Sequence, residues 1–399
     1  MRPLVFIPAL ACLCMTTAWA DAADTVNLSV GYAMQFDSNL FRLPDSADSR
    51  TALGSSTLSE RIGVTSVALS LDKTYSLQRF QLSGSLINYH YQNFGYLSFN
   101  AFNYGAAWQW SLTPRIRGTI TTDRNQVLNS FSDYRTYTTR NVRTDKTTRV
   151  EGEADLGAAV RMLAGLDSVR RTNEVPGVLD GDRSAQGVFI GLRYVFPSGS
   201  TVSYRFRKGD GESNNGLDLG SAGTGRFDDQ LHELQASWVL TAKTTLYGTV
   251  GHLSRKYPDA FSRRDFDGPV ADVSVQWDIT GKTSLNAALR RELINYQSDI
   301  SNYVISDRVI LKPRWKATSR ISVLGTFEYA QRSFGGSPLA AGAGAARSDS
   351  FQLASFGVEW QALNSATVSL MLQRMKNTSN YAAFAFESTG ASISARLVF

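Results

Sequence analysis

Apolar and polar residues alternate with a period of two along most of the chain. From Val26 to Met34 every second residue is apolar, and polar or small residues fill the positions between them. A period of two places one set of side chains on each face of a β-strand. The same alternation recurs at 187–196, 272–279 and 392–399. No segment of comparable length shows the 3.6-residue period of an amphipathic helix, so we predict an all-β protein.

Short turns and longer loops follow one another along the sequence, with one hairpin in each interval between short turns. We place the short turns at Asp72-Lys73, Thr113-Pro114, Ala164-Gly165, Pro197-Ser198-Gly199, Ala242-Lys243, Gly281-Lys282, Thr318-Ser319 and Asn364-Ser365. Longer polar loops lie between them at 42–58, 129–145, 173–184, 209–227, 257–268 and 335–349, with tighter ones near 95, 299 and 379. Short turns on one side and long loops on the other are typical of an outer-membrane barrel. We therefore predict a transmembrane antiparallel β-barrel of about 18 strands.

Aromatic residues gather within a few positions of the short turns. They are Tyr75, Trp108, Trp110, Tyr194, Phe196, Tyr204, Trp238, Trp277, Trp315 and Trp360. An interfacial girdle of a membrane barrel lies at this level, whereas a large soluble β-sandwich gives its aromatics no reason to gather at strand ends. The mean hydropathy of −0.19 also fits a barrel, because half of every strand faces water.

The first 20 residues have the pattern of an export signal. Arg2 is followed by the apolar run 4–13 and by Ala18-Trp19-Ala20, an A-x-A cleavage site. Both cysteines, Cys12 and Cys14, lie in this stretch, but their neighbours fit a lipoprotein signal poorly. We expect residues 1–20 to be a signal peptide of the Sec pathway, and residues 21–399 to be one outer-membrane barrel domain. The mature chain then has no thiol, which excludes a cysteine nucleophile and a disulfide scaffold.

Signals of catalysis and of bound cofactors are weak. The chain has three scattered histidines (His90, His232 and His252) and no G-x-S-x-G, P-loop or H-E-x-x-H motif. We predict that the protein is not an enzyme and binds no cofactor or metal. The acidic loop 209–227 has oxygen ligands for Ca²⁺ but lacks the spacing of a calcium loop, so a solvated loop is the favoured interpretation. The Gly/Ala run 335–342 could fold into the lumen or extend into solvent.

The polar positions of the alternation should face the lumen of the barrel. On the predicted strand 145–162 the apolar positions from Val150 to Val160 face lipid, and charged residues alternate with them. The candidate lumen residues are Glu151, Glu153, Arg193, Arg205, Arg207, Arg308 and Arg314. A ring of about 18 strands is wide enough for an aqueous channel between such walls.

Arg193 and Arg205 flank the turn at 197–200. A bend centred on residue 199 would place them directly opposite each other on the inward face, where like charges are destabilising. Glu233 or Asp167 on the adjacent strands could compensate, as could solvent in a wide bore. Alternatively, the two arginines and Arg207 form a patch near the periplasmic mouth that contacts anions.

The segment 36–45 carries a family resemblance. Its residues Asp37, Asn39, Leu40, Phe41, Arg42 and Pro44 resemble the D-x-N-[LV]-[FY]-R-L-P stretch of outer-membrane β-barrel proteins encoded in exopolysaccharide-biosynthesis operons, which are related to a broader group of porin-like barrels. The final aromatic, Phe399, resembles the insertion signal of bacterial outer-membrane proteins. A structural interpretation of the segment stays open: Asp37 and Asn39 form a turn, Phe41 anchors at the membrane interface and Pro44 begins the loop.

Two functions are consistent with these features. The resemblance implies a role in exopolysaccharide biosynthesis or export, as a polar-lined conduit or assembly component in the outer membrane. Its partners would then be an extracellular polysaccharide, neutral or acidic, the outer-membrane lipid, and periplasmic or inner-membrane export components, with no nucleic acid. The alternative is a general or small-solute porin whose charged lumen acts as a filter. The sequence contains no plug-like or long periplasmic domain, which argues against a gated siderophore transporter.

Overall fold

Eighteen antiparallel strands form almost the whole molecule. The computed structural model describes residues 25–133, 137–175, 182–214, 225–258, 264–296, 301, 303–336 and 346–399. The strands are β1 (Val26–Asp37), β2 (Glu60–Tyr75), β3 (Gln78–Tyr91), β4 (Phe99–Thr113), β5 (Ile116–Leu128), β6 (Val142–Asp155), β7 (Val160–Asn173), β8 (Asp182–Val195), β9 (Thr201–Asn214), β10 (Arg226–Thr241), β11 (Thr244–Lys256), β12 (Phe266–Trp277), β13 (Thr283–Asn295), β14 (Tyr303–Lys316), β15 (Ile321–Gly335), β16 (Ser348–Leu363), β17 (Ala366–Ser379) and β18 (Phe386–Val398). The helical pieces are short: α1 (Ser49–Leu53), η2 (Gly95–Leu97) and η4 (Ala382–Phe384).

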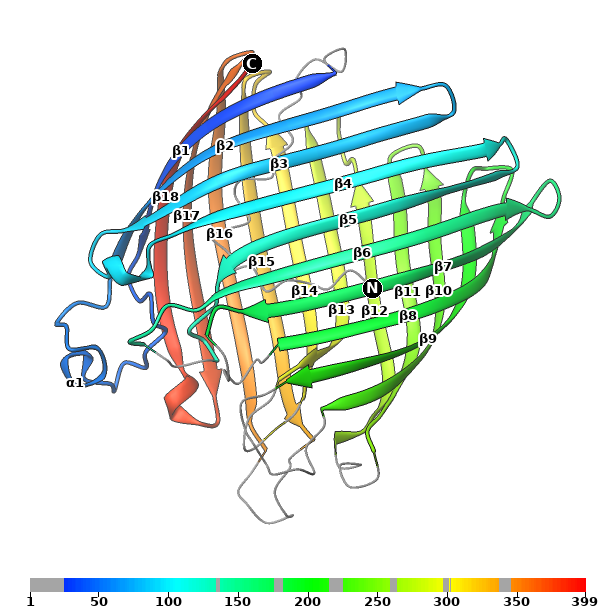
Figure 1. The fold of residues 1–399 in the computed structure, drawn as a ribbon. Coiled ribbons are helices and arrows are strands. Elements are labelled where there is room, and N and C mark those ends of the chain that lie inside the picture. Colours follow the sequence, from blue (N-terminus) through cyan, green and yellow to red (C-terminus); the bar gives the residue numbers. More distant parts are fainter. Residues whose placement is uncertain are drawn as a thin grey trace.

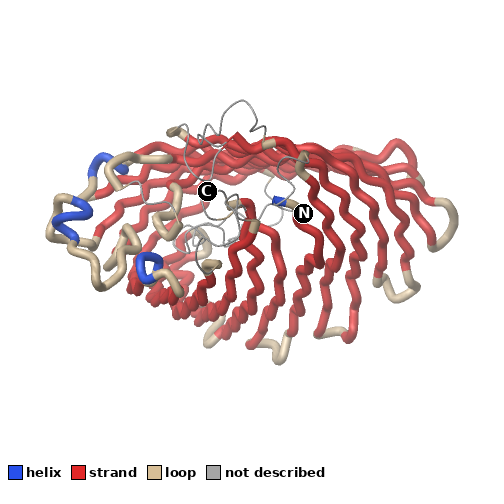
Figure 2. The backbone as a smooth tube through the Cα atoms, turned by 90° about the horizontal axis from the view of Figure 1, so that it is seen from below, coloured by secondary structure: helices blue, strands red, loops and turns tan. Residues whose placement is uncertain are grey.

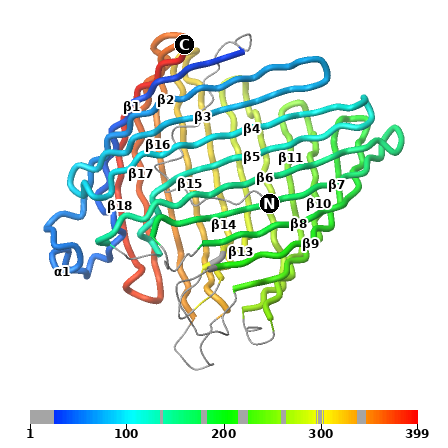
Figure 3. Tube along the Cα trace, viewed as in Figure 1, coloured from blue at the N-terminus to red at the C-terminus, as the bar shows by residue number. Residues whose placement is uncertain are grey.

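The sheet closes on itself. Each strand pairs with its sequence neighbours, and β1 pairs with both β2 and β18 (Figure 1). In Figure 3 the blue first strand lies beside the red last strand, which marks the seam of the barrel. Closure leaves no sheet edge with unpaired backbone groups, as a membrane-spanning sheet requires. The predicted all-β class, the barrel and its strand number are confirmed.

Side chains alternate between the two faces of this wall as the sequence predicts. On β8 the outward residues Val188, Ile190 and Leu192 are 55, 65 and 53% exposed, although all three are apolar. Such a surface would be unstable in water, but it suits the hydrocarbon of a membrane. Of the residues assigned to the girdle, Trp277, Trp315 and Trp360 are among the exposed large hydrophobic residues.

Two of the eight predicted short turns are wrong. β2 continues through Asp72 and Lys73, and the chain turns at Ser76 and Leu77. The turn predicted at Ala164-Gly165 lies at 156–159, so the predicted strand 145–162 is the end of one hairpin arm, β6, and the start of the other, β7. A four-residue turn keeps the even positions apolar on both arms, and this continuity hid the turn in the sequence pattern.

Connections after even-numbered strands are short and lie at one end of the barrel, whereas those after odd-numbered strands are longer and lie at the other. We call these the turn end and the loop end. Figure 2 views the barrel from the loop end and shows α1 and several loops gathered over one side of the mouth. Within the described ranges no helix is both long and apolar enough to cross a membrane.

Candidate functional site in the barrel lumen

All seven predicted lumen residues lie at inward-facing positions. Glu151 and Glu153 are on β6, Arg193 on β8, Arg205 and Arg207 on β9, and Arg308 and Arg314 on β14. Their outward neighbours on β8 and β9, Tyr194 and Tyr204, are 45 and 47% exposed. The period-two pattern therefore assigned these side chains to the correct face of the wall.

Strands β5 to β9 carry most of the charge on one side of the lumen, and we call this surface the arginine wall. Its members are Arg117, Arg149, Arg161, Arg193, Arg205 and Arg207, with the carboxylates Glu151, Glu153, Asp155 and Asp167. Residues at paired positions of neighbouring strands project from the same face, so the alternation of each strand places these groups side by side across the sheet.

Glu153 is the meeting point of the arginine wall near the turn end. Its carboxylate lies 2.5 Å from Arg117 and 2.8 Å from Arg161, and Arg193 donates to its second oxygen. Asp155 adds a second contact of 2.8 Å to Arg117. Only 8% of the Glu153 side chain is exposed, whereas Arg117 and Arg161 are each 29% exposed. The guanidiniums therefore face the lumen while the carboxylate lies against the wall.

Further from the turns, Glu151 pairs with Arg205 at 2.9 Å and with Arg149 at 3.0 Å. Both arginines also stack on the ring of Phe189, with guanidinium-to-centroid distances of 4.8 Å for Arg149 and 5.1 Å for Arg205. The ring in turn covers Gly165, where a Cβ atom would lie 2.4 Å from it. Glycine is therefore required here, and it lets the aromatic ring and the arginines lie flat against the sheet.

Arg207 continues the wall towards the loop end. Its guanidinium makes a two-point contact with Asp167, at 2.7 and 2.6 Å. It also lies over Gly187 and Gly209, whose added Cβ atoms would come within 2.5 and 2.8 Å of it. Two-point pairs of this kind fix the orientation of a guanidinium as well as its position.

The predicted opposition of Arg193 and Arg205 is wrong. Val195 pairs with Thr201, which centres the turn on residue 198, so Arg193 lies opposite Ser203 and Arg205 opposite Gly191. Of the two predicted compensating carboxylates, Glu233 lies directly opposite Arg205 in the register of β9 and β10, whereas Asp167 pairs with Arg207. The ion-pair contacts of Arg193 and Arg205 are with Glu153 and Glu151 of β6. The one-residue shift in the turn moves the two arginines apart along the strands and removes the clash.

The opposite side of the lumen carries smaller ionic groups. Arg308 lies between Glu328, at 3.4 Å, and Glu292, at 3.8 Å, and is 8% exposed. Arg314 pairs with Glu359 at 3.2 Å nearer the turn end and is 41% exposed. Of these two predicted residues, Arg314 is therefore the one that a solute can reach.

The family-like motif forms a clasp across the seam of the barrel. Arg42 donates two hydrogen bonds to the Asp37 carboxylate, at 2.8 and 2.7 Å, and Ser388 of β18 donates a third at 2.6 Å. The Asn39 side chain donates to the carbonyls of Leu43 and of Glu387, the latter on β18. Arg42 has φ +56°, a conformation that costs a non-glycine residue roughly 1–2 kcal/mol. We infer that its buried ion pair outweighs this cost.

The motif also directs a hydrophobic residue into the barrel, which corrects the interpretation of Phe41 as an interface anchor. Phe41 is completely buried, with its ring centroid 4.7 Å from those of Phe94 and Phe131. It belongs to a mouth cluster inside the loop end, together with Leu40, Leu43, Ile62, Val64, Tyr91, Leu97, Phe99, Ala101, Leu128 and Val142. This cluster fills part of the lumen, whereas the sequence pattern alone predicts an open bore.

Glu60 supports the mouth cluster, a role that no sequence pattern predicts. Its fully buried carboxylate accepts backbone hydrogen bonds from Gln92, Asn93 and Phe94, at 2.7–3.2 Å. These bonds hold the β3–β4 connection against β2. Its position at the first residue of a strand gave no local sign of this role.

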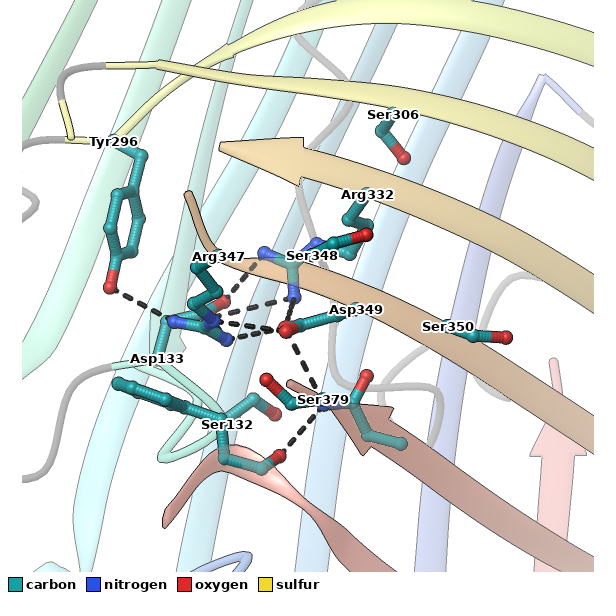
Figure 4. A network of polar contacts seen from close by, with 12 residues as sticks. Ser132, Asp133, Tyr296, Ser306, Arg332, Arg347, Ser348, Asp349, Ser350 and Ser379 are labelled. Atoms are coloured by element: carbon teal, nitrogen blue, oxygen red, sulfur yellow. Dashed lines mark hydrogen bonds and ion pairs between the residues drawn. The ribbon is translucent and has the colours of Figure 1, made fainter. Parts of the chain in front are cut away.

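The connection between β5 and β6 reaches across the lumen; we call its described residues, 129–133 and 137–141, the cross-lumen loop. Near β5 it packs through Phe131 on Phe41. On the far side, Asp133 lies 2.9 Å from Arg332 of β15 and 2.9 Å from Arg347, which directly precedes β16 (Figure 4). Six strands separate β5 from β16 in one direction around the barrel, and eight separate β6 from β15 in the other.

The remaining predicted features add no site. Most of the acidic loop 209–227 and of the Gly/Ala run 335–342 lies outside the described residues. Among the described residues no group of three or more His, Cys, Asp or Glu side chains could hold a metal ion. His232 and His252 pair across β10 and β11 and lie on the outer face, away from the lumen.

Comparison with known proteins identifies the architecture. OpdK of Pseudomonas aeruginosa, in a structure with vanillate, aligns with a TM-score of 0.51 at 12% identity over 94% of this chain and 99% of that one. OccK2 (OpdF) of the same organism and a BenF-like porin of Pseudomonas fluorescens Pf-5 both give a TM-score of 0.50, at 13 and 11% identity, and each covers 94% of this chain and 98% of the other. The chain has the fold of an outer-membrane porin.

Sequence comparison agrees over the C-terminal part of this porin-like barrel. Residues 239–399 match the family described as "Putative beta-barrel porin 2". No curated protein matches the sequence. The porin-like fold places the protein in the outer membrane, with its apolar outer face in lipid.

Proposed function

We propose that the protein is a small-solute porin whose lumen favours anions that carry a carboxylate. The observation that carries this proposal is the arginine wall. It contains six guanidiniums against four carboxylates, an excess of two positive charges. Rings and rows of arginine are a usual basis of anion selectivity in pores. The vanillate named with OpdK is an aromatic carboxylate, which supports the same class of solute.

The exposure of the wall fits this function. Arg117, Arg149, Arg161 and Arg193 are 23–30% exposed, so their guanidiniums reach the lumen while their carboxylate partners hold them in place. A guanidinium that is already oriented can form a two-point contact with a passing carboxylate at little cost in side-chain entropy. Because the wall carboxylates stay paired, such contacts would be weak enough for the solute to leave again.

Channel measurements test this proposal. We expect a salt gradient across a planar bilayer to give a reversal potential on the anion side, and liposomes to admit benzoate faster than benzylamine. The double variant Arg117→Gln/Arg161→Gln should reduce the anion preference. The control Arg291→Gln removes an arginine that is paired with Asp307 on the outer face, and should leave the preference unchanged. Cation preference, or no response to the double variant, would overturn the proposal.

The role in exopolysaccharide biosynthesis stays a prediction from the resemblance at 36–45. The contacts of the motif account for its residues without a polysaccharide, since Asp37, Asn39 and Arg42 hold the seam and Phe41 fills the mouth cluster. Deletion of the gene separates the two functions. A fall in secreted polysaccharide with normal uptake of small nutrients favours export, and the reverse favours the porin.

A further inference from the structure

Asp133 differs from the carboxylates of the arginine wall because it belongs to a loop and not to a strand. The wall carboxylates are fixed by the register of β6 and β7. Asp133 instead reaches its partners from the other side of the barrel, and these partners lie 199 and 214 positions further along the chain. It can therefore leave its partners without any change in the sheet.

The place that Asp133 occupies is built from residues on or directly next to β13, β15 and β16, which we call the far wall. Arg347 pairs with Asp349 of β16 at 2.5 Å, its Nη1 donates to the Tyr296 hydroxyl at 3.2 Å, and its guanidinium lies 4.1 Å from the centroid of Phe334. Arg332 is held by the register of β15 and lies 3.7 Å from Asp349. None of these contacts involves Asp133, which Figure 4 shows beside them, so we expect them to hold both guanidiniums in place when the loop carboxylate leaves.

The charge balance shows what this place requires. Arg332 and Arg347 carry two positive charges, and Asp349 supplies one negative charge from the wall. The four charged side chains are largely buried, at 7, 1, 0 and 15% exposure for Arg332, Arg347, Asp349 and Asp133. Asp133 supplies a second negative charge beside these two guanidiniums, and removal of a partner from such a buried ionic group is destabilising. Asp133 is the most exposed of the four, and hence lies on the side that faces the lumen.

We propose that Arg332 and Arg347 form a binding site for the carboxylate of a solute, and that Asp133 fills this site when no solute is present. The proposal rests on the porin function proposed above. A solute carboxylate and the Asp133 carboxylate have the same charge and the same two-point geometry towards guanidiniums. Exchange of one carboxylate for the other leaves the net charge of the site unchanged. Solute binding at the far wall and attachment of the cross-lumen loop to that wall are therefore alternative states.

Competition with Asp133 predicts how affinity changes when the loop carboxylate is removed. In the native protein the site is filled, which lowers the apparent affinity for an external carboxylate. We expect Asp133→Asn to lower the benzoate concentration that half-blocks the single-channel current by about tenfold or more. Benzyl alcohol, which has the same ring without the charge, should show no such change. Arg332→Gln added to Asp133→Asn should abolish the gain.

Asp265→Asn is the matched control. Asp265 is also a loop carboxylate with a cationic partner, Lys256 at 3.1 Å, but among the described residues it has no contact with the far wall or with the cross-lumen loop. It should leave benzoate block unchanged. Asp133→Ala serves as a second variant, because it leaves no amide that could bond the guanidiniums.

Unchanged benzoate block in both Asp133 variants, with the barrel still folded, would overturn the proposal. Loss of the folded barrel in both variants would also overturn it, because Asp133 would then be an obligatory part of the structure. The porin function is judged separately from the anion preference of the native protein. A native channel that prefers anions, with Asp133 variants that do not differ in block, would refute only the exchange site.

Discussion

The clasp between Asp37 and Arg42 allows a quantitative test of what holds the seam of the barrel. Both side chains are buried, at 3 and 8% exposure, and they share two hydrogen bonds. Removal of one partner of such a pair leaves the other charge buried and unpaired, which costs about 3–5 kcal/mol. We therefore expect Arg42→Met and Asp37→Asn each to lower the free energy of unfolding by an amount in this range.

The double variant separates the ion pair from the other contacts of the two residues. With both charges removed, no unpaired charge stays buried, so Asp37→Asn/Arg42→Met should lose clearly less than the sum of the two single variants. The control is Asp307→Asn on the outer face. Asp307 and Arg291 are 49 and 41% exposed, and such pairs contribute at most about 1 kcal/mol.

Urea titrations of the protein in lipid vesicles, followed by tryptophan fluorescence, provide the measurement. The shift between the heated and unheated forms on a denaturing gel shows whether each variant begins as a closed barrel. Losses that simply add in the double variant would refute the reasoning. So would single variants that lose no more than the Asp307 control.

Three further predictions follow from the loop end and the arginine wall. Phe41→Ala should lower the local stability by about 3–5 kcal/mol, because the ring is fully buried. Limited proteolysis should then cut the segment 38–59 while the barrel stays folded. Glu151→Gln should increase anion preference in reversal-potential measurements, since Arg149, Arg193 and Arg205 lose a shared partner; an unchanged potential would count against a filter made of these groups. Burial alone would raise the pKa of Asp133, but the charges of Arg332 and Arg347 outweigh it and hold this pKa below its usual range. The loop should therefore be fully attached at neutral pH and should detach only as the pH falls below the ordinary range of an aspartate. The measurement is the channel current as a function of pH. A change in current with a midpoint above pH 5, on the order of one unit above the pKa of a free aspartate, would contradict this prediction.

The sequence predicted the wall of the barrel well, because one simple rule governs every strand. A residue that faces lipid must be apolar, and the next one faces water. The sequence of each strand therefore indicates which residues face lipid and which face the lumen. This was enough for the strand number, the loop end and the inward position of Glu151 or Arg308. The rule failed at 156–159 because the even-numbered residues stay apolar through the turn, so the alternation shows no break there. It failed at Asp72 because a charged residue at a strand end can face the lumen and pair with Arg79.

The interior contacts could not be predicted in the same way. The register of Arg193 and Arg205 depends on one residue of turn geometry at 196–200, where Gly199 takes φ +81°. Phe41 has no local feature that distinguishes burial in the lumen from anchoring in lipid, since both environments favour an aromatic ring. The contact of Asp133 with Arg347 spans 214 positions and depends on how a loop crosses the mouth, which no local pattern records.

The position of the clasp has a consequence for how the barrel is assembled. Asp37, Asn39 and Arg42 follow the first strand directly, but their partners Ser388 and the Glu387 carbonyl belong to the last one. At the opposite end of the seam, the Phe399 amide donates to the Leu28 carbonyl at 2.8 Å. The residues beside β1 are synthesised first, whereas their partners in and after β18 are synthesised last. A chain that stops before β18 can form the Asp37–Arg42 pair but lacks the Ser388 hydroxyl and the Glu387 carbonyl that the clasp binds. The first and last strands can therefore join only after β18 has been made.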